Sequence, residues 1–339
     1  MHIPDNYLSP STCAALGAAM VPVWVVSVKK VKEEVSKAKM PLLGIGAAFS
    51  FLMMMFNVPL PGGTTGHAVG GTLLAILLGP YSACISVTVA LLVQALLFGD
   101  GGILAFGANC FNMAFVLPFA GYFVYRLLKA LFKSEKGEYL GIVLGSYLAI
   151  NLAALSTAIE FGIQPYLFTS AAGQALYCPY PLSVSIPAML IPHLLVAGVV
   201  EALFTVFIFA FIKKVSPGTL YEGAQKRSKA VYGLLAALIL LTPLGLLAAG
   251  TAWGEWGAEE IRSVVSGGKP LGFVPEGMAH GFSFQALFSD YTVSGLPEVA
   301  GYVLSALFGV AIMIILFRIL GSLIKSKAGA PLGPTDGSK

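Results

Sequence analysis

The chain has 339 residues, of which 57% are hydrophobic and only 11% charged, and its formal net charge is +4. An ordinary soluble domain carries about 25% charged residues, so this composition excludes a water-soluble globular protein. Apolar runs of about twenty residues, long enough as helices to cross a hydrocarbon core, recur along most of the sequence. They lack the alternation of barrel strands. We therefore expect an all-α, polytopic integral membrane bundle in the lipid bilayer.

Nine candidate membrane spans follow one another along the chain, and the third is short and rich in glycine. Residues 1–220 are expected to form a seven-helix unit, and residues 221–339 a two-helix unit with a long extracytoplasmic loop at about 251–296. The spans are expected at about residues 10–28, 40–56, 65–79, 80–98, 105–125, 139–162, 183–212, 230–250 and 297–321.

Basic residues gather in alternate connectors. Residues 29–39, 126–136 and 213–229, together with the C-terminal tail, contain 18 of the 20 Lys and Arg residues. The positive-inside rule places these segments in the cytoplasm, so the N-terminus is expected outside and the C-terminus inside. The same rule explains the net positive charge without a nucleic-acid partner.

Motifs of common enzymes are missing from the sequence. It contains no GxxxxGK[ST] phosphate loop, GxSxG elbow, HExxH or Rossmann glycine pattern. The four cysteines have no CxxC spacing, so neither a thiolate metal site nor a disulfide framework is indicated. We expect no catalytic residue and no catalytic cofactor.

The N-terminus predicts a metal site. The opening MHIPDNYLSP lacks the basic region and cleavage site of a signal peptide, so a free amine at Met1 is expected. That amine, the deprotonated amide nitrogen of His2 and His2 Nδ1 can form fused five- and six-membered chelate rings. A fourth nitrogen would complete the square arrangement that Ni(II) and Cu(II) prefer.

His67 is the candidate for this fourth nitrogen. It follows a Gly- and Pro-rich turn at 57–66, on the same outer side as the N-terminus. The sequence thus predicts a metal site of Met1, His2 and His67. As an alternative, His2 is a solvated chain end and His67 is bonded to a neighbouring carbonyl group.

Other polar residues are expected to have structural roles. His193 and Glu201 lie eight residues apart in one span, which favours a buried hydrogen-bonded pair, with a second metal or proton site as the alternative. His280 is expected to be solvated. A further set either orients metal-bound imidazoles or satisfies irregular backbone, the second role being favoured for the aspartate: Gln94, Asp100, Asn109, Asn112 and Glu160.

Three segments resemble the M components (CbiM/NikM type) of nickel and cobalt energy-coupling-factor transporters. They are MHIPDNYLSP, NVPLPGGTTGHAVGGTLLAILLGP at 57–80 and QALLFGDGGILAFGANCFNMAF at 94–115. The segment at 290–320 is similar to the two-helix, PDGLE-type N component, here fused to the M component. In this family the N-terminal amine, His2 and a second histidine form the site, which the resemblance maps onto Met1, His2 and His67. Asn6 stands where Gly is usual, and Asn also tolerates a left-handed backbone.

The resemblance implies a substrate-specific subunit of an ATP-driven importer in a prokaryotic plasma membrane, working with a transmembrane coupling (Q-type) subunit and cytoplasmic ATPase (O-type) subunits. It captures Ni(II), or alternatively Co(II), on the extracytoplasmic side; the opening MHIPD with LSP favours nickel. A stand-alone metal/proton transporter using His193 and Glu201 is the competing hypothesis, and an enzyme or structural subunit is disfavoured. The loop at 251–296 is expected to help load or gate the site.

Adding any residue before Met1, or making His2→Ala, is expected to abolish metal binding. Either change removes nitrogens from the predicted chelate while leaving the membrane spans intact. Metal titration of the purified variants measures the effect. Undiminished binding by the N-terminally extended variant would contradict the chelate.

Overall fold

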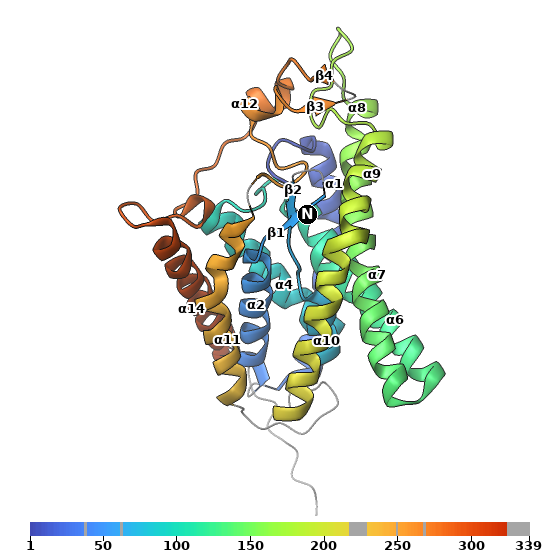
Figure 1. Cartoon of the computed structure of the whole chain (residues 1–339), viewed down its shortest axis with the longest axis vertical. Coiled ribbons are helices and arrows are strands. Elements are labelled where there is room, and N and C mark those ends of the chain that lie inside the picture. Colours follow the sequence, from blue (N-terminus) through green and yellow to red (C-terminus); the bar gives the residue numbers. More distant parts are fainter. Residues whose placement is uncertain (37–38, 62–63, 217–228, 249, 267–268, 324–339) are drawn as a thin grey trace, which may run out of the picture.

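A computed structural model describes residues 1–36, 39–61, 64–216, 229–248, 250–266 and 269–323 (Figure 1). The linker at 217–228 and the tail lysines Lys325, Lys327 and Lys339 lie outside the described residues. Seven described helices are long and apolar enough to cross a membrane, and Met40–Met55 is a shorter apolar helix. The prediction of an all-α membrane bundle is confirmed. The long helices are Pro10–Glu34, Pro80–Phe98, Phe106–Phe132, Glu135–Leu167, Leu182–Val215, Lys229–Leu247 and Glu298–Ser322.

In the N-terminal part of the bundle, the described residues form ten helices and one hairpin. They are α1 (Pro10–Glu34), α2 (Met40–Met55), β1 (Val58–Leu60), β2 (Thr64–Gly66), α3 (Gly71–Leu78), α4 (Pro80–Val93), α5 (Phe106–Asn109), α6 (Leu117–Phe132), α7 (Glu135–Gly162), α8 (Gln164–Leu167), α9 (Leu182–Pro192) and α10 (Gly198–Val215). Three π-helical turns interrupt this part, at Gln94–Phe98, Cys110–Val116 and His193–Ala197.

The C-terminal part has two long helices and a folded connection between them. Its elements are α11 (Lys229–Leu241), α12 (Ala258–Ile261), β3 (Val265–Ser266), β4 (Lys269–Pro270), α13 (Glu276–Ala279) and α14 (Glu298–Leu323).

Local sequence decides where the first long helix begins. The Ser9 side chain accepts a hydrogen bond from the Thr12 amide at 3.1 Å, and Pro10 occupies the first helical turn. A serine cap satisfies a backbone donor that a helix start leaves free, and proline fits there because it has no N–H to lose. The start of α1 is thereby fixed immediately after the N-terminal segment.

The expected third span, 65–79, is not a crossing helix, so the prediction of nine spans is not confirmed. Its first residues pair with β1 in an antiparallel hairpin, with Val58 opposite Gly66, and only eight residues remain for α3. At 1.5 Å per residue α3 spans about 12 Å, too short for a hydrocarbon core of about 30 Å. Gly70 precedes α3 with φ +73°, a left-handed conformation that glycine adopts readily.

A carboxylate from α10 holds the start of this short helix. The Val69 amide donates to Glu201 Oε2 at 2.8 Å, and the Gly70 amide donates to both carboxylate oxygens at 3.1 Å. Helix N-termini favour anions because their first N–H groups lack intrahelical partners. Glu201 therefore fixes the segment that carries His67.

The expected pair of His193 with Glu201 is wrong. His193 Nδ1 donates instead to the Met189 carbonyl oxygen of its own helix at 2.7 Å. The π-helical turn at His193–Ala197 lies between the two residues and disturbs the spacing on which the prediction depended. Each residue still makes a structural bond, but with a different partner.

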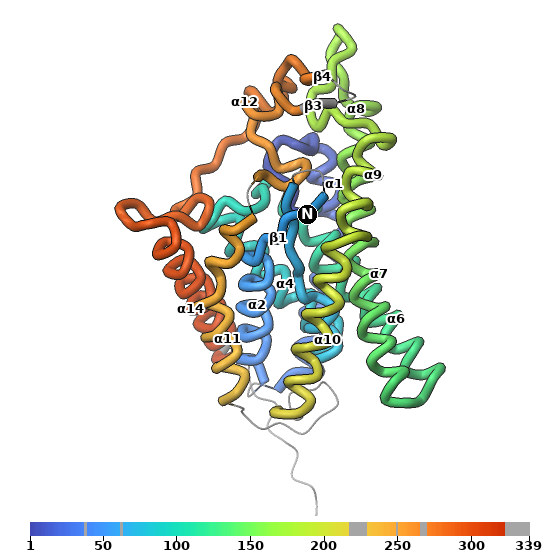
Figure 2. The backbone as a smooth tube through the Cα atoms, viewed as in Figure 1, coloured from blue at the N-terminus to red at the C-terminus, as the bar shows by residue number. Residues whose placement is uncertain are grey.

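Helices α11 and α14 pack beside α2 on one side of the bundle (Figure 2). The approach of α14 to α2 is close: a Cβ on Gly44 would lie 3.0 Å from Phe317 Cβ and 3.1 Å from the Met313 oxygen. The connection between α11 and α14 passes over one end of the bundle. There its aromatic residues join a buried cluster with residues of the N-terminal part: Tyr7, Phe161, Tyr180, Trp253 and Trp256.

Candidate metal centre

The N-terminal segment enters the body of the protein and is pinned there by Asn109. The Ile3 amide donates to Asn109 Oδ1 at 2.8 Å, and Asn109 Nδ2 donates back to the Ile3 oxygen at 3.0 Å. The Asp5 carboxylate accepts hydrogen bonds from the amides of Ile103 and Leu104, at 3.1 and 2.7 Å. These bonds fix the backbone on both sides of residue 4. The first two residues are thereby directed inward.

Two residues allow this close approach of backbone to backbone. A Cβ on Gly102 would lie 2.4 Å from the Asp5 amide nitrogen, so only glycine fits, and the Gly102 amide donates to the Ile3 oxygen at 2.8 Å. Asn6 has φ +68°, which confirms that it adopts the left-handed conformation. Its side chain exchanges two hydrogen bonds with the Phe282 backbone, at 2.8 and 2.9 Å.

The structure brings the three predicted ligand residues together in the interior. Met1, His2 and His67 are 5%, 3% and 6% exposed, and the two imidazole centroids lie 4.9 Å apart. Nε2 of His2 and Nε2 of His67 are both buried without a hydrogen-bond partner among the described residues. Buried polar atoms are normally satisfied, so orphan nitrogens on two neighbouring imidazoles indicate a place for a ligand. The reading of His2 as a solvated chain end is wrong.

His67 has the tautomer that a metal ligand needs. Its Nδ1 donates to the Ala68 oxygen at 3.2 Å, the neighbouring carbonyl that the alternative hypothesis named. That bond leaves the lone pair of Nε2 available. Burial, together with the charges of the Met1 amine and His2, holds the pKa of His67 well below its usual range. The ring is therefore neutral at physiological pH and able to bind a cation.

Asp100 contacts the imidazole of His2 directly. Its Oδ1 lies 2.8 Å from His2 Nδ1, and Gln94 Nε2 donates to its Oδ2 at 3.1 Å. Burial would raise the pKa of Asp100, but the charge and hydrogen bond of His2 outweigh it, so the pKa lies well below its usual value. The expectation that Asp100 mainly satisfies backbone is wrong: its carboxylate orients His2. Chelation through Nδ1 therefore requires His2 to exchange Asp100 for the ion.

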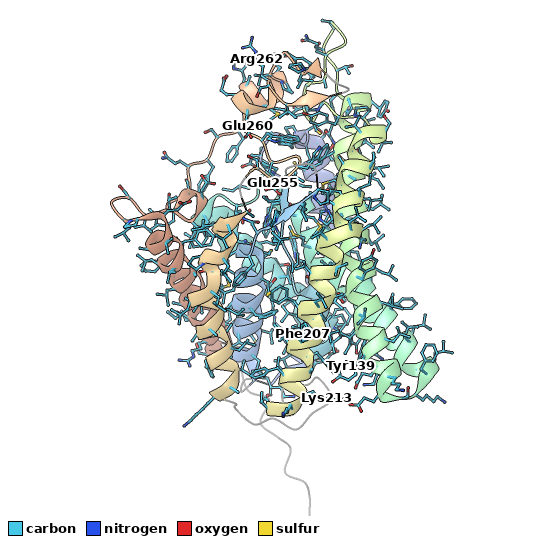
Figure 3. All side chains as sticks on the ribbon, viewed as in Figure 1. Tyr139, Phe207, Lys213, Glu255, Glu260 and Arg262 are labelled. Carbon is cyan, nitrogen blue, oxygen red and sulfur yellow. The ribbon has the colours of Figure 1, made fainter. Side chains whose placement is uncertain are left out.

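Two residues of the C-terminal part reach the site, and sequence reasoning missed both. Glu255 Oε1 lies 3.3 Å from the Met1 amine, and the Tyr291 hydroxyl donates to Asp100 Oδ2. They lie 254 and 191 residues from their partners, so no local spacing could reveal the contacts. Figure 3 shows Glu255 toward the end of the bundle that the connection between α11 and α14 covers, far from Lys213 at the other end.

The other polar residues singled out in the sequence do not join the three predicted ligand residues. Asn112 Nδ2 donates to Glu160 Oε2 at 2.8 Å and to Thr157 Oγ1 at 3.1 Å, which ties two helices together. His193 and Met1 line the same small pocket beside β2, but no bond joins them among the described contacts. His280 is exposed, as expected.

Comparison with protein families gives two matches that together cover most of the chain. Residues 2–219 match the model described as cobalt uptake substrate-specific transmembrane region, and residues 227–326 match the PDGLE domain.

Relatives with the same two-part arrangement are named as nickel transport proteins. A probable fused nickel transport protein of Lactiplantibacillus plantarum is 55% identical, covering 94% of this chain and 97% of its own. The fused nickel transport protein of Rhodobacter capsulatus is 45% identical, covering 93% and 95%. Among solved structures, a truncated transition metal transporter is 57% identical with a TM-score of 0.60, covering 63% of this chain and 99% of that one.

Gly102→Ala is expected to weaken Ni(II) binding about tenfold or more, because the added methyl group displaces the segment that orients His2. Gly17→Ala in α1 is the matched control, since a Cβ there meets nothing within 4 Å. Competition titration gives the affinities and thermal unfolding tests folding. Equal affinities of the two folded variants would contradict the importance of this contact.

Proposed function

The chain belongs to the family of cobalt uptake substrate-specific transmembrane proteins, with a PDGLE domain fused behind it, and we propose that its substrate is Ni(II) captured from the extracytoplasmic side. It is accordingly a multi-pass transport protein of the prokaryotic plasma membrane. The observation that supports the proposed site most is the burial of Met1, His2 and His67 together, with the proposed donor Nε2 of His67 unpartnered among the described residues.

The proposed donors are the Met1 amine, the amide nitrogen and Nδ1 of His2, and Nε2 of His67. Binding removes the protons from the amine, the amide and Nδ1, and it separates Nδ1 from Asp100. Four nitrogens in a square suit Ni(II) better than Co(II), which remains the alternative substrate. A competing mode in the same site uses Nε2 of His2 without the amide, and it would give a different spectrum.

The partners are proposed from the family. A transmembrane coupling (Q-type) subunit and cytoplasmic ATPase (O-type) subunits would supply the driving force, in keeping with the absence of a phosphate-loop motif from the sequence. We also propose that residues 1–220 form the metal-binding unit and residues 221–339 the fused two-helix unit. Vesicles that contain this chain alone should not accumulate nickel; uptake without ATPase subunits would favour a stand-alone transporter.

Purified protein with its native N-terminus is expected to bind one equivalent of Ni(II), more tightly than Co(II), as a yellow diamagnetic complex. Both properties follow from a square N₄ site with a deprotonated amide. His67→Ala is expected to lose this complex, because one of the four nitrogens is gone. Metal analysis, competition titration and absorption spectroscopy measure the outcome. A green, paramagnetic complex indifferent to His67 would contradict the proposed donors.

Affinity for Ni(II) is expected to fall steeply as the pH drops below about 6.5, because every ligating nitrogen must be free of its proton. Burial lowers the pKa of His67, so proton competition at that ring begins only in more acidic solution. Titrations at several pH values between about 8 and 5 test this. A flat response over that range would indicate carboxylate ligands instead.

A further inference from the structure

The C-terminal part of the chain touches the metal site at two separate places. Glu255, from the connection just before α12, lies against the Met1 amine, and Tyr291, from the turn before α14, contacts Asp100. Both residues fall within the segment that matches the PDGLE domain. The two contacts reach different groups in the site: Glu255 faces the Met1 amine, and Tyr291 faces the Asp100 carboxylate that contacts His2.

Tyr291 is held firmly in an unfavourable backbone conformation. Tyr291 and the preceding Asp290 have φ +59° and +53°, left-handed values that are rare for residues other than glycine. The backbone carbonyl oxygen of Tyr291 accepts a hydrogen bond from Ser305 Oγ at 2.9 Å, and the Tyr291 ring stacks on Phe98 with centroids 4.8 Å apart. Such strain persists where the surroundings enforce it, and it is concentrated at functional sites.

The strained turn delivers a hydroxyl group to Asp100. The Tyr291 hydroxyl donates to Asp100 Oδ2 and accepts from Gln94 Nε2 at 2.9 Å. Burial and the nearby Asp100 carboxylate raise the pKa of Tyr291 well above its usual range, so the phenol keeps the proton that it donates. Oδ1 of Asp100 is then left to hold the imidazole of His2. A chain of contacts thus runs from the C-terminal part to a proposed ligand.

Glu255 places a negative charge next to the proposed ion. Ni(II) bound to one deprotonated amide and three neutral nitrogens carries a net charge of +1, and the three residues that supply these donors are almost completely buried. A buried cation is costly unless an anion lies close to it. Asp100 provides one carboxylate on the His2 side, and Glu255 provides another on the amine side. Without Glu255, the amine side of the site has no carboxylate among the described contacts.

We propose that the C-terminal unit completes the metal site, with Tyr291 as a positioning residue that keeps the Asp100 carboxylate on the His2 side of the ion, and with Glu255 as the anion on the amine side. This inference rests on the proposed function, because it concerns the surroundings of the same Met1, His2 and His67 donors. It makes the fused unit part of the binding site, in addition to its packing against the bundle.

A purely structural role is the competing explanation, and the chain offers a control for each residue. The Tyr302 hydroxyl donates to the Met55 oxygen at 2.8 Å, joining α14 to α2 without contacting Asp100. Glu260 lies on the same connection as Glu255 and accepts a hydrogen bond from Thr251 Oγ1 at 3.0 Å. Tyr302→Phe therefore removes a hydroxyl that does not bond to Asp100 and keeps the ring that packs edge-on against Tyr291, with centroids 5.4 Å apart. Glu260→Gln removes a carboxylate charge that does not contact the Met1 amine.

The test compares Ni(II) affinity of the full chain with its native N-terminus, as Tyr291→Phe beside Tyr302→Phe, and as Glu255→Gln beside Glu260→Gln. Tyr291→Phe and Glu255→Gln are each expected to weaken Ni(II) binding about tenfold, the usual effect of losing a residue that orients or balances a metal ligand. Their controls are expected to stay within about twofold of the wild type. Absorption spectra should keep the square-planar band in all four, since no donor is lost.

Parallel titrations of the wild type and His67→Ala separate the two proposals. If the wild type binds Ni(II) and His67→Ala does not, while Tyr291→Phe and Glu255→Gln bind like the wild type, the inference is overturned and the proposed function stands. If Tyr291→Phe merely loses thermal stability to the same extent as Tyr302→Phe, the hydroxyl is structural. Failure of the wild type to bind Ni(II) would overturn both.

Discussion

The structure depends on holding a chain terminus inside a membrane protein. An amine and two imidazoles are buried at one end of the bundle, where each unpaired polar group is costly. Asn109 exchanges two hydrogen bonds with Ile3, and Asp5 accepts two more from the facing loop. These bonds satisfy the backbone groups of Ile3 and the side-chain carboxylate of Asp5. Of the proposed donors, Nε2 of His67 is left without a partner in the described part of the chain, whereas the Met1 amine and His2 Nδ1 each lie against a carboxylate.

The irregular backbone of the bundle serves the same site. A short helix that does not cross the membrane brings His67 inward, and Glu201 satisfies the free amides at its start. The π-helical turn at Gln94–Phe98 ends just before Asp100, and Gln94 bonds to that carboxylate. Non-helical backbone at membrane depth is tolerated only where protein or a polar cavity surrounds it. These interruptions mark the position of the site rather than defects of the bundle.

The C-terminal part of the chain contributes to the surroundings of the proposed site. The connection between α11 and α14 covers the N-terminal segment with an aromatic cluster and brings Glu255 to the Met1 amine. The strained turn before α14 brings Tyr291 to Asp100. The idea that the loop at 251–296 helps to load or gate the site thereby acquires specific contacts, because any movement of this cover would change the partners of the amine and of Asp100.

The sequence by itself determined the membrane bundle and the candidate donors. Composition excludes a soluble fold, and a histidine behind a free amine is a chelator by covalent geometry alone. Tertiary structure decided the rest. The short length of α3 and the separation of His193 from Glu201 follow from irregular backbone, a hairpin and a π-helical turn, that interrupts the apolar runs. The contacts of Glu255 and Tyr291 join residues far apart in the chain. Hydrophobic periodicity records which segments are apolar, but it contains no information about which distant polar groups meet.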